Sequence, residues 1–208
     1  MKKILSGIPQ IEKTKIVFQY SLVLLGSFLC GCFLTQLISV TALQQIEEAL
    51  VYHFELPFVE CEGLFEALRM IAGITLGDII CISLVFFSVF TFFNYLISDA
   101  VLFYAGFNFG FSVCLILKLF SDSEMLIIHA PSGVEIFTYV VTRSLYIALL
   151  LYFSIKLSFG SFKIKTLKPN GRYAISLSVF GSALAFALIL SVISVILKLS
   201  YCFVIYKF

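Results

Sequence analysis

An arginine stands inside an apolar stretch that carries no other charge. Arg143 divides the run Ile136–Ile155 and lies eight residues after Glu135. In a regular helix this spacing places the arginine about 12 Å below the glutamate. A charge at that depth in a membrane is costly, so it faces a polar partner or lines a path for ions or protons. The candidate partners are the polar residues in or beside the apolar runs: Glu135 and Asp78, which are nearest in depth, and Asn94 and Asn108.

Two roles for Arg143 follow from this placement. The first is structural, either as one internal salt bridge or with the head group extended towards the membrane surface. The second is membership of a relay, which needs further charged groups at the same depth. We favour the structural role because the sequence offers no second and third charge there.

Few other residues of the chain suit catalysis or metal binding. His53 and His129 are the only histidines, and neither belongs to a metal-ligand pattern. Glu47-Glu48 resembles the paired glutamates of intramembrane prenyl-protein proteases, but the arginine expected after them is missing. The sequence has no ATPase phosphate-binding loop and no Gly-x-Ser-x-Gly with a membrane histidine. We therefore expect no enzymatic activity, no metal and no cofactor.

The cysteines show no pattern of ligands. Cys30, Cys32, Cys81 and Cys114 fall in apolar runs, where we expect them to pack as small apolar residues. Within a helix, the Cys-x-Cys spacing of the first two orients the sulfurs poorly for one ion. Cys61 and Cys202 lie outside the apolar runs, and of the two alternatives for them, a disulfide or two unpaired thiols, we favour the unpaired thiols.

The elements that must position these residues are long apolar segments. Together with Ile136–Ile155 they make five, each about long enough to cross a hydrocarbon core some 30 Å thick. Hydrophobic residues form 61% of the chain and charged residues 12%, about half the charged fraction of a soluble domain. We therefore predict an all-α integral membrane protein, a bundle of about five transmembrane helices. The uncharged runs are Ile16–Ile46 (31 residues), Ile79–Ser98 (20), Ala100–Leu117 (18) and Tyr173–Leu197 (25).

The predicted organisation has three parts. Residues 1–15 form a cytoplasmic lead, in which Pro9 interrupts any helix. Residues 16–198 form a single transmembrane domain, and residues 199–208 form a short tail at the membrane interface. The predicted spans are residues 16–43, 74–98, 100–117, 135–155 and 173–197.

Charges outside the spans predict the orientation. Two segments, the lead and the link between the fourth and fifth spans, hold nine of the 14 basic residues. Lysine and arginine favour the cytoplasmic side, so the N-terminus is predicted there and the protein is assigned to the bacterial cytoplasmic membrane as a multi-pass protein. Five spans then leave the C-terminus outside, which Lys198 and Lys207 oppose mildly. The nine basic residues are Lys2, Lys3, Lys13, Lys15, Lys156, Lys163, Lys165, Lys168 and Arg172.

The loops between the spans differ in kind. The first outer loop, residues 44–70, is acidic and contains two amphipathic segments, Gln44–Tyr52 and Leu64–Ile71. These segments form either helices on the outer membrane face or a solvated helical loop packed on the bundle. Only Asn94–Asp99 separates the second and third spans, so we expect a tight helical hairpin there, or a pair that does not span fully.

Glycines four residues apart predict close helix contacts. Gly106 and Gly110 share one helix face, and Gly73 and Gly77 repeat the spacing at the start of the second span. Small residues at this spacing let two helix backbones approach. We favour packing within one bundle over contact with a partner protein.

The stretch Ile79–Leu117 resembles a known family. Its Phe103–Ser112 segment, Phe-Tyr-Ala-Gly-Phe-Asn-Phe-Gly-Phe-Ser, is similar to the aromatic "GF-x-x-GF" segment in the third span of the stage II sporulation protein M family. That family then carries Pro-His-Gly and an acidic residue at the start of the next helix. Here Pro131, Ser132, Gly133 and Glu135 are the counterparts, with serine in place of histidine and the glutamate one place early. The resemblance covers about residues 70–155.

This resemblance implies a non-enzymatic membrane scaffold. The family's namesake holds peptidoglycan-degrading proteins at the membrane during engulfment in sporulation. The outer loops 44–70 and 118–135 would then face other membrane or secreted cell-wall proteins, with the lipid bilayer around the helices. A homo-oligomer is compatible with this role, and nucleic acid is not expected.

Two other functions remain open. The main alternative is the membrane-spanning subunit of an export or ABC-type transport system. Arg143 with Glu135 or Asp78 would then line a polar path, and the basic link 156–172 would bind the cytoplasmic ATPase. A weaker alternative is a self-immunity protein against a membrane-active peptide.

Overall fold

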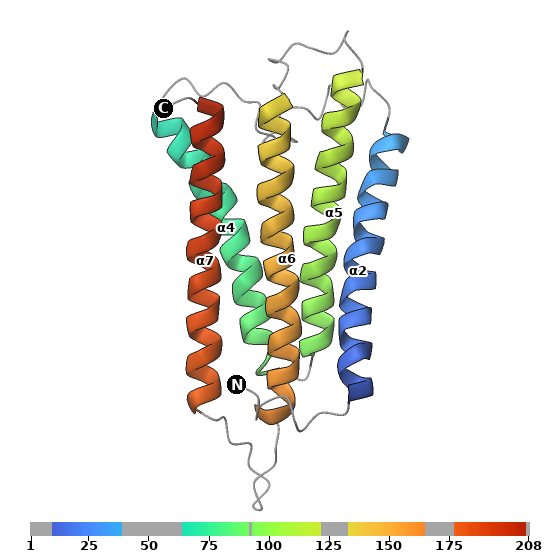
Figure 1. The fold of residues 1–208 in the computed structure, drawn as a ribbon, viewed down its shortest axis with the longest axis vertical. Coiled ribbons are helices and arrows are strands. Elements are labelled where there is room, and N and C mark those ends of the chain that lie inside the picture. Colours follow the sequence, from blue (N-terminus) through green and yellow to red (C-terminus); the bar gives the residue numbers. More distant parts are fainter. Residues whose placement is uncertain (1–9, 39–63, 92, 122–132, 165–176, 207–208) are drawn as a thin grey trace, which may run out of the picture.

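Five α-helices make up the part of the chain that the computed structural model describes, residues 10–38, 64–91, 93–121, 133–164 and 177–206. Each helix runs opposite to the one before it, and together they form a bundle with no strand among the described residues (Figure 1). We call the end where α2 and α5 begin the lower end, as drawn in Figure 1. The helices are α2 (Gln10–Leu37), α4 (Leu64–Ser88), α5 (Asn94–Ser121), α6 (Gly133–Ile164) and α7 (Leu177–Tyr206).

Three of these helices are long and apolar enough to cross a membrane. Their apolar segments are Thr14–Leu37 in α2, Asn94–Lys118 in α5 and Ile136–Phe159 in α6. The other two helices carry shorter apolar segments, Leu76–Ser88 in α4 and Gly181–Leu197 in α7. The predicted all-helical fold is therefore confirmed, and three of the five predicted spans meet the length and polarity that a crossing requires.

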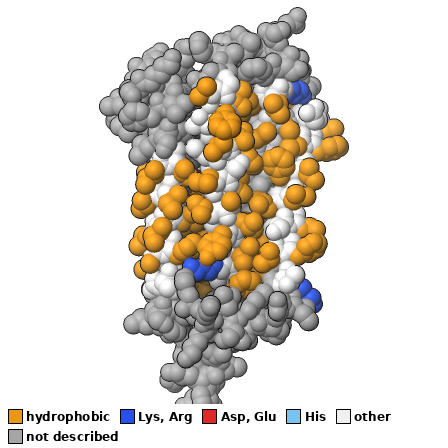
Figure 2. Space-filling view, viewed as in Figure 1, with side chains coloured by type: hydrophobic (Ala, Val, Ile, Leu, Met, Phe, Trp, Pro, Cys, Tyr) orange, Lys and Arg blue, Asp and Glu red, His pale blue; other side chains and the backbone are white. Residues whose placement is uncertain are grey.

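The outer surface of the bundle is apolar. Large side chains such as Phe18, Phe33, Phe93 and Phe137 are 66–69% exposed. Apolar side chains cover the middle of the face in Figure 2, and the lysine and arginine side chains in view lie near its two ends. Water-soluble monomers seldom expose apolar patches beyond a few hundred Å². A lipid environment explains this surface, so the molecule is a membrane protein.

Apolar side chains from four helices fill the centre. Val85, Leu102, Leu150 and Phe153 are fully buried, and Leu190 is 2% exposed. They come from α4, α5, α6 and α7, so these four helices share one core. Helix α2 lies at the edge of the bundle and packs chiefly against α5, to which it runs parallel (Figure 1).

The turn between α4 and α5 corrects one prediction. Asn94–Asp99 was expected to form the hairpin junction, but α4 ends at Ser88 and these residues form the first turns of α5. The Ser88 hydroxyl donates to the carbonyl of Val85 (2.7 Å), and the Thr91 hydroxyl donates to the carbonyl of Ser88 (2.8 Å). The backbone N–H groups of Val89, Phe90 and Thr91 bond the carbonyls of Phe86, Phe87 and Ser88. Backbone and hydroxyl groups together therefore satisfy the last carbonyls of α4, and the helix ends inside an uncharged run.

Several helix ends differ from the predicted span ends. Backbone hydrogen bonds can continue a helix beyond its apolar segment, as in α6 and α7. Helix α2 ends at Leu37 rather than near residue 43, and α6 continues to Ile164. Helix α7 extends to Tyr206 and includes most of the predicted tail, while Leu64–Ile71 is the start of α4 and not a separate helix. Gln44–Tyr52, Cys61 and Pro131 lie outside the described residues.

Candidate functional site

Arg143 and Asp78 form a buried ion pair between α6 and α4. The Arg143 Nη1 atom donates to Asp78 Oδ1 over 2.9 Å, and the two side chains are 7% and 4% exposed. Asp78 was one of the four candidate partners of the arginine. The guanidinium neutralises the carboxylate, so neither charge is buried alone.

Tyr146 completes this site from the same face of α6. It follows Arg143 by three residues, a spacing that places both side chains on one side of the helix. The guanidinium carbon lies 5.0 Å from the centre of the Tyr146 ring, a cation–π distance. The Tyr146 hydroxyl donates to the backbone carbonyl of Asp78 (3.3 Å). Asp78 is thus bonded through its side chain and its backbone, and α4 is tied to α6.

Of the other candidate partners of Arg143, the two asparagines lie elsewhere. Asn94 is the first residue of α5, at the lower end of the bundle. Asn108 is half-buried further along α5. Glu135 is in the first turn of α6, where its side chain is outside the described part.

A second polar group, which the sequence analysis did not single out, lies near the lower end. We call Tyr20, Ser88, Asn94, Ser98 and Ser158 the hydroxyl cluster; all are at most 1% exposed. Tyr20 Oη and Ser158 Oγ are 2.5 Å apart and share a hydrogen bond between α2 and α6. Asn94 Oδ1 accepts from Ser88 (2.8 Å) and from Ser98 (3.5 Å). These bonds join α2 to α6 and α4 to α5 through neutral groups.

Asp99 lies on the edge of the hydroxyl cluster and is less completely bonded. Its Oδ2 accepts from Gln19 Nε2 over 2.6 Å. Its Oδ1 is buried and has no hydrogen-bond donor among the described residues. The residue as a whole is only half-buried, so water or a cation can still reach the carboxyl group.

Glycines set the spacing of the seam between α2 and α5. A Cβ atom added to Gly110 would overlap the backbone carbonyl of Phe28, and one added to Gly106 would overlap the Ser27 hydroxyl. From the opposite side, a Cβ on Gly31 would overlap the carbonyl of Phe107. The two backbones are therefore in direct contact along three glycines. Gly106 and Gly110 therefore lie in a close helix contact, as predicted from their four-residue spacing.

The second glycine pair behaves differently. Gly77 is exposed, and no atom lies within 4 Å of a Cβ built on it. The predicted packing role of Gly77 is therefore wrong, because this face of α4 points away from its neighbours. Gly73 also belongs to α4, but its surroundings are not described. Gly31 was missed as a packing residue, although Ser27, Gly31 and Thr35 form a small-residue stripe with the same four-residue spacing.

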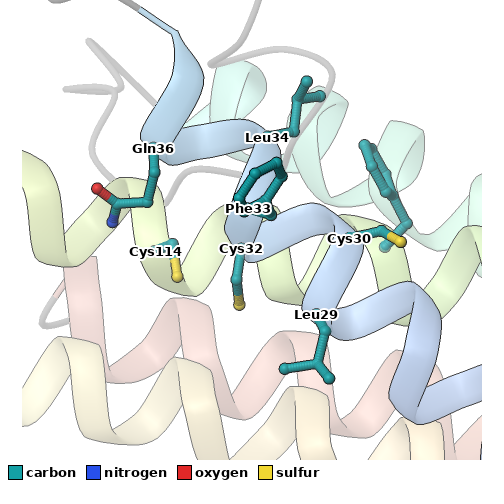
Figure 3. Close-up of a pocket in the computed structure, with 8 residues that line it drawn as sticks. Leu29, Cys30, Cys32, Phe33, Leu34, Gln36 and Cys114 are labelled. Atoms are coloured by element: carbon teal, nitrogen blue, oxygen red, sulfur yellow. The ribbon is translucent and has the colours of Figure 1, made fainter.

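A groove follows the α2–α5 seam on the lipid side. It encloses about 760 Å³. Figure 3 shows that the Cys32 and Cys114 side chains point to the same side of the seam. Cys30 also lines the groove, but its side chain projects from another side of α2 and points away from Cys114. The walls are apolar apart from the thiols and one amide. The lining residues are Leu29, Cys30, Cys32, Phe33, Leu34, Gln36, Phe107 and Cys114.

The described residues contain no group of three or more histidine, cysteine, aspartate or glutamate residues that could hold a metal ion. His53 and His129 are outside that part of the chain. Of the loop motif, Gly133 is the first residue of α6. Gly133 and Glu135 therefore lie in the first turn of a helix, the position in which an acidic side chain is favoured.

The chain has no detected relative. No family model matches it, and no curated protein or solved structure shows significant similarity. The resemblance to the stage II sporulation protein M family rests on the motif residues alone.

Proposed function

We propose that this protein is a non-enzymatic scaffold of the bacterial cytoplasmic membrane, with five membrane crossings and its N-terminus inside. Its role would be to hold extracytoplasmic cell-wall-remodelling proteins, as in the stage II sporulation protein M family. The observation that carries this proposal is the closed Arg143–Asp78 pair. The deepest charges of the bundle bond to each other, which suits a rigid anchor and not a conducting path.

The arrangement of the helix ends supports the orientation. The start of α2, the end of α6 and the start of α7 lie together at the lower end (Figure 1). These ends adjoin the two basic segments of the sequence, so one end of the bundle is basic, as the positive-inside rule requires. Helices α4 and α7 have 25 and 30 residues, and at about 1.5 Å per residue both reach across a hydrocarbon core.

The upper end provides a fixed base for the outer loops. The Lys118 amine in α5 donates to the carbonyls of Thr35 (3.1 Å) and Ile38 (2.7 Å) at the end of α2. A cation there also favours the negative end of the helix dipole. The points from which both outer loops leave the bundle are thereby held together, which would present the loops as one binding surface.

Photo-crosslinking from the outer loops tests the scaffold. A crosslinking amino acid at position 53 or 129 is expected to capture wall-associated proteins in intact cells. A crosslinker in the basic link, at position 168, is the matched control and should not capture them. Capture of cytoplasmic proteins alone, from all three positions, would contradict the proposal.

The second candidate function is the membrane subunit of an export or ABC-type transport system. It is favoured by Asp99, whose buried Oδ1 has no donor within the described residues and which adjoins the hydroxyl cluster. Such a subunit would co-purify with an ATPase, and this association should be lost when Lys163, Lys165 and Lys168 are replaced by glutamine. A wall protein captured at positions 53 and 129 with no ATPase decides for the scaffold.

A further inference from the structure

Two thiols from different helices meet beside the α2–α5 seam. Cys32 of α2 and Cys114 of α5 both line the lipid-side groove, and their side chains point to the same side of the seam (Figure 3). The Cys32 thiol also donates to the carbonyl of Gly110 (3.4 Å). In a helix that carbonyl accepts the backbone N–H of Cys114, four residues on. The thiol of Cys32 therefore lies against the helical turn that carries Cys114.

The glycine contacts at this level favour the short helix separation that a disulfide needs. A disulfide needs Cα atoms about 4.4–6.8 Å apart, whereas the axes of most packed helices are about 8–10 Å apart. Gly31, next to Cys32, faces the Phe107 carbonyl and the Phe111 N–H so closely that a Cβ atom there would overlap both. The glycine contacts thus bring the two backbones nearer than side-chain packing allows.

Access to the thiols is through lipid. Both residues are half-buried, and the groove beside them has the side chains of Leu29, Phe33 and Phe107 as walls. Apolar walls exclude hydrophilic reagents and admit lipid-soluble ones. The Gln36 amide on the rim provides a polar contact for a carbonyl group.

We propose that Cys32 and Cys114 are a redox-active dithiol, which closes to an interhelical disulfide when a lipid-soluble quinone enters the groove. Two S–H bonds break and one S–S bond forms. The two electrons and two protons pass to the quinone, which becomes the quinol. Because α2 packs on the bundle chiefly through α5, the bond fixes the edge helix to the core covalently. This inference is independent of the proposed function.

A cleavable form of the full chain provides the test. A protease site is inserted near residue 50, between α2 and α4, and membranes carrying the protein are treated with a short-chain ubiquinone. Free thiols are then alkylated, the site is cleaved, and the fragments are separated without reductant. The α2 fragment holds only Cys30 and Cys32, so any link to the remainder passes through one of them. Most of the α2 fragment is expected to stay linked and to be released by dithiothreitol.

Single substitutions identify the two sulfurs. Cys32→Ser and Cys114→Ser should each abolish the link, while Cys30→Ser, whose thiol projects from another side of α2, should leave it unchanged. Cys32→Ala and Cys114→Ala repeat the test without a polar replacement. A link that survives in the Cys114 variants, or that disappears in Cys30→Ser, overturns the assignment. If copper–phenanthroline produces the link and the quinone does not, the quinone is not the oxidant; if neither produces it, the dithiol is refuted.

Discussion

Two seams of the bundle are held by opposite means. The seam between α4 and α6 depends on long side chains, with Arg143 and Asp78 joined over 2.9 Å in a site where both are nearly inaccessible. The seam between α2 and α5 depends on the absence of side chains, because Gly31 and Gly110 bring the backbones into contact. Each seam also contains one aspartate, Asp78 in the first and Asp99 in the second.

The two aspartates differ in how deeply their side chains are buried and in the partners that they bond. The Asp78 side chain is 4% exposed and has an arginine as its partner, because a lone buried carboxylate costs several kcal/mol. Asp99 is half-buried and bonds only a neutral amide, Gln19, through its Oδ2. Among the described residues, the carboxylate in the interior is therefore paired with a cation, and the one nearer the end of the bundle is not. The α4–α6 seam should consequently be the more sensitive one to the loss of a charge.

The largest effect is expected from Arg143→Leu. This change leaves Asp78 buried without its cation and should lower the free energy of unfolding by about 3–5 kcal/mol. Reversible unfolding in mixed micelles measures the loss. In the double variant Arg143→Leu/Asp78→Leu no charge is left uncompensated, so most of the stability should return. If the single variant loses less than about 1 kcal/mol, the pair is not a stabilising contact and the contrast between the seams fails.

An intermediate effect is expected from Gly110→Ala. The new methyl group meets the Phe28 carbonyl, a backbone atom that cannot rotate away, so the helices must separate. Such overpacking costs about 1–3 kcal/mol, again measured by unfolding in micelles. Separation should also weaken the nearby hydrogen bond from Cys32 to the Gly110 carbonyl.

Gly26→Ala is the matched control, because it makes the same change in α2 at a position with no atom within 4 Å. Alanine favours a helix over glycine by up to about 1 kcal/mol, so this variant should be neutral or slightly more stable. Equal losses from both variants would mean that close backbone contact does not hold the α2–α5 seam.

The features of the fold and site that depend on composition and residue spacing could be predicted from the sequence. Four uncharged runs and the run broken by Arg143 predicted five helices, and five are present, although the run Ile79–Ser98 contains the turn between α4 and α5. Arg143 had Asp78 among its four candidate partners, since both side chains must avoid lipid. Gly106 and Gly110 were predicted to be helix-packing residues from their four-residue spacing alone. The same spacing failed at Gly77, because a small-residue stripe does not reveal which face of its helix meets another helix.

The end of α4 and the hydroxyl cluster could not be predicted from the sequence, because both depend on contacts that form only in the folded structure. The end of α4 at Ser88 is closed by backbone turn bonds and two hydroxyl groups within an apolar run, where no charge, proline or glycine marks a turn. Tyr20 and Ser158 are 138 residues apart, and neither has a neighbour in sequence that predicts the other. The hydroxyl cluster therefore became visible only once α2 and α6 were placed together.

The smallest effect is expected from Asp99→Asn in the α2–α5 seam. The same substitution at Asp78 in the α4–α6 seam allows the two stability changes to be compared directly. The asparagine at 99 keeps an oxygen to accept from Gln19 and removes a carboxylate whose Oδ1 has no donor in the described part of the chain. Unfolding in micelles should show a change within about 0.5 kcal/mol, of either sign. The asparagine at 78 leaves Arg143 without a counter-charge and should cost several kcal/mol. Equal losses at both sites would mean that Asp99 has a charged partner and that depth does not decide how these carboxylates are neutralised.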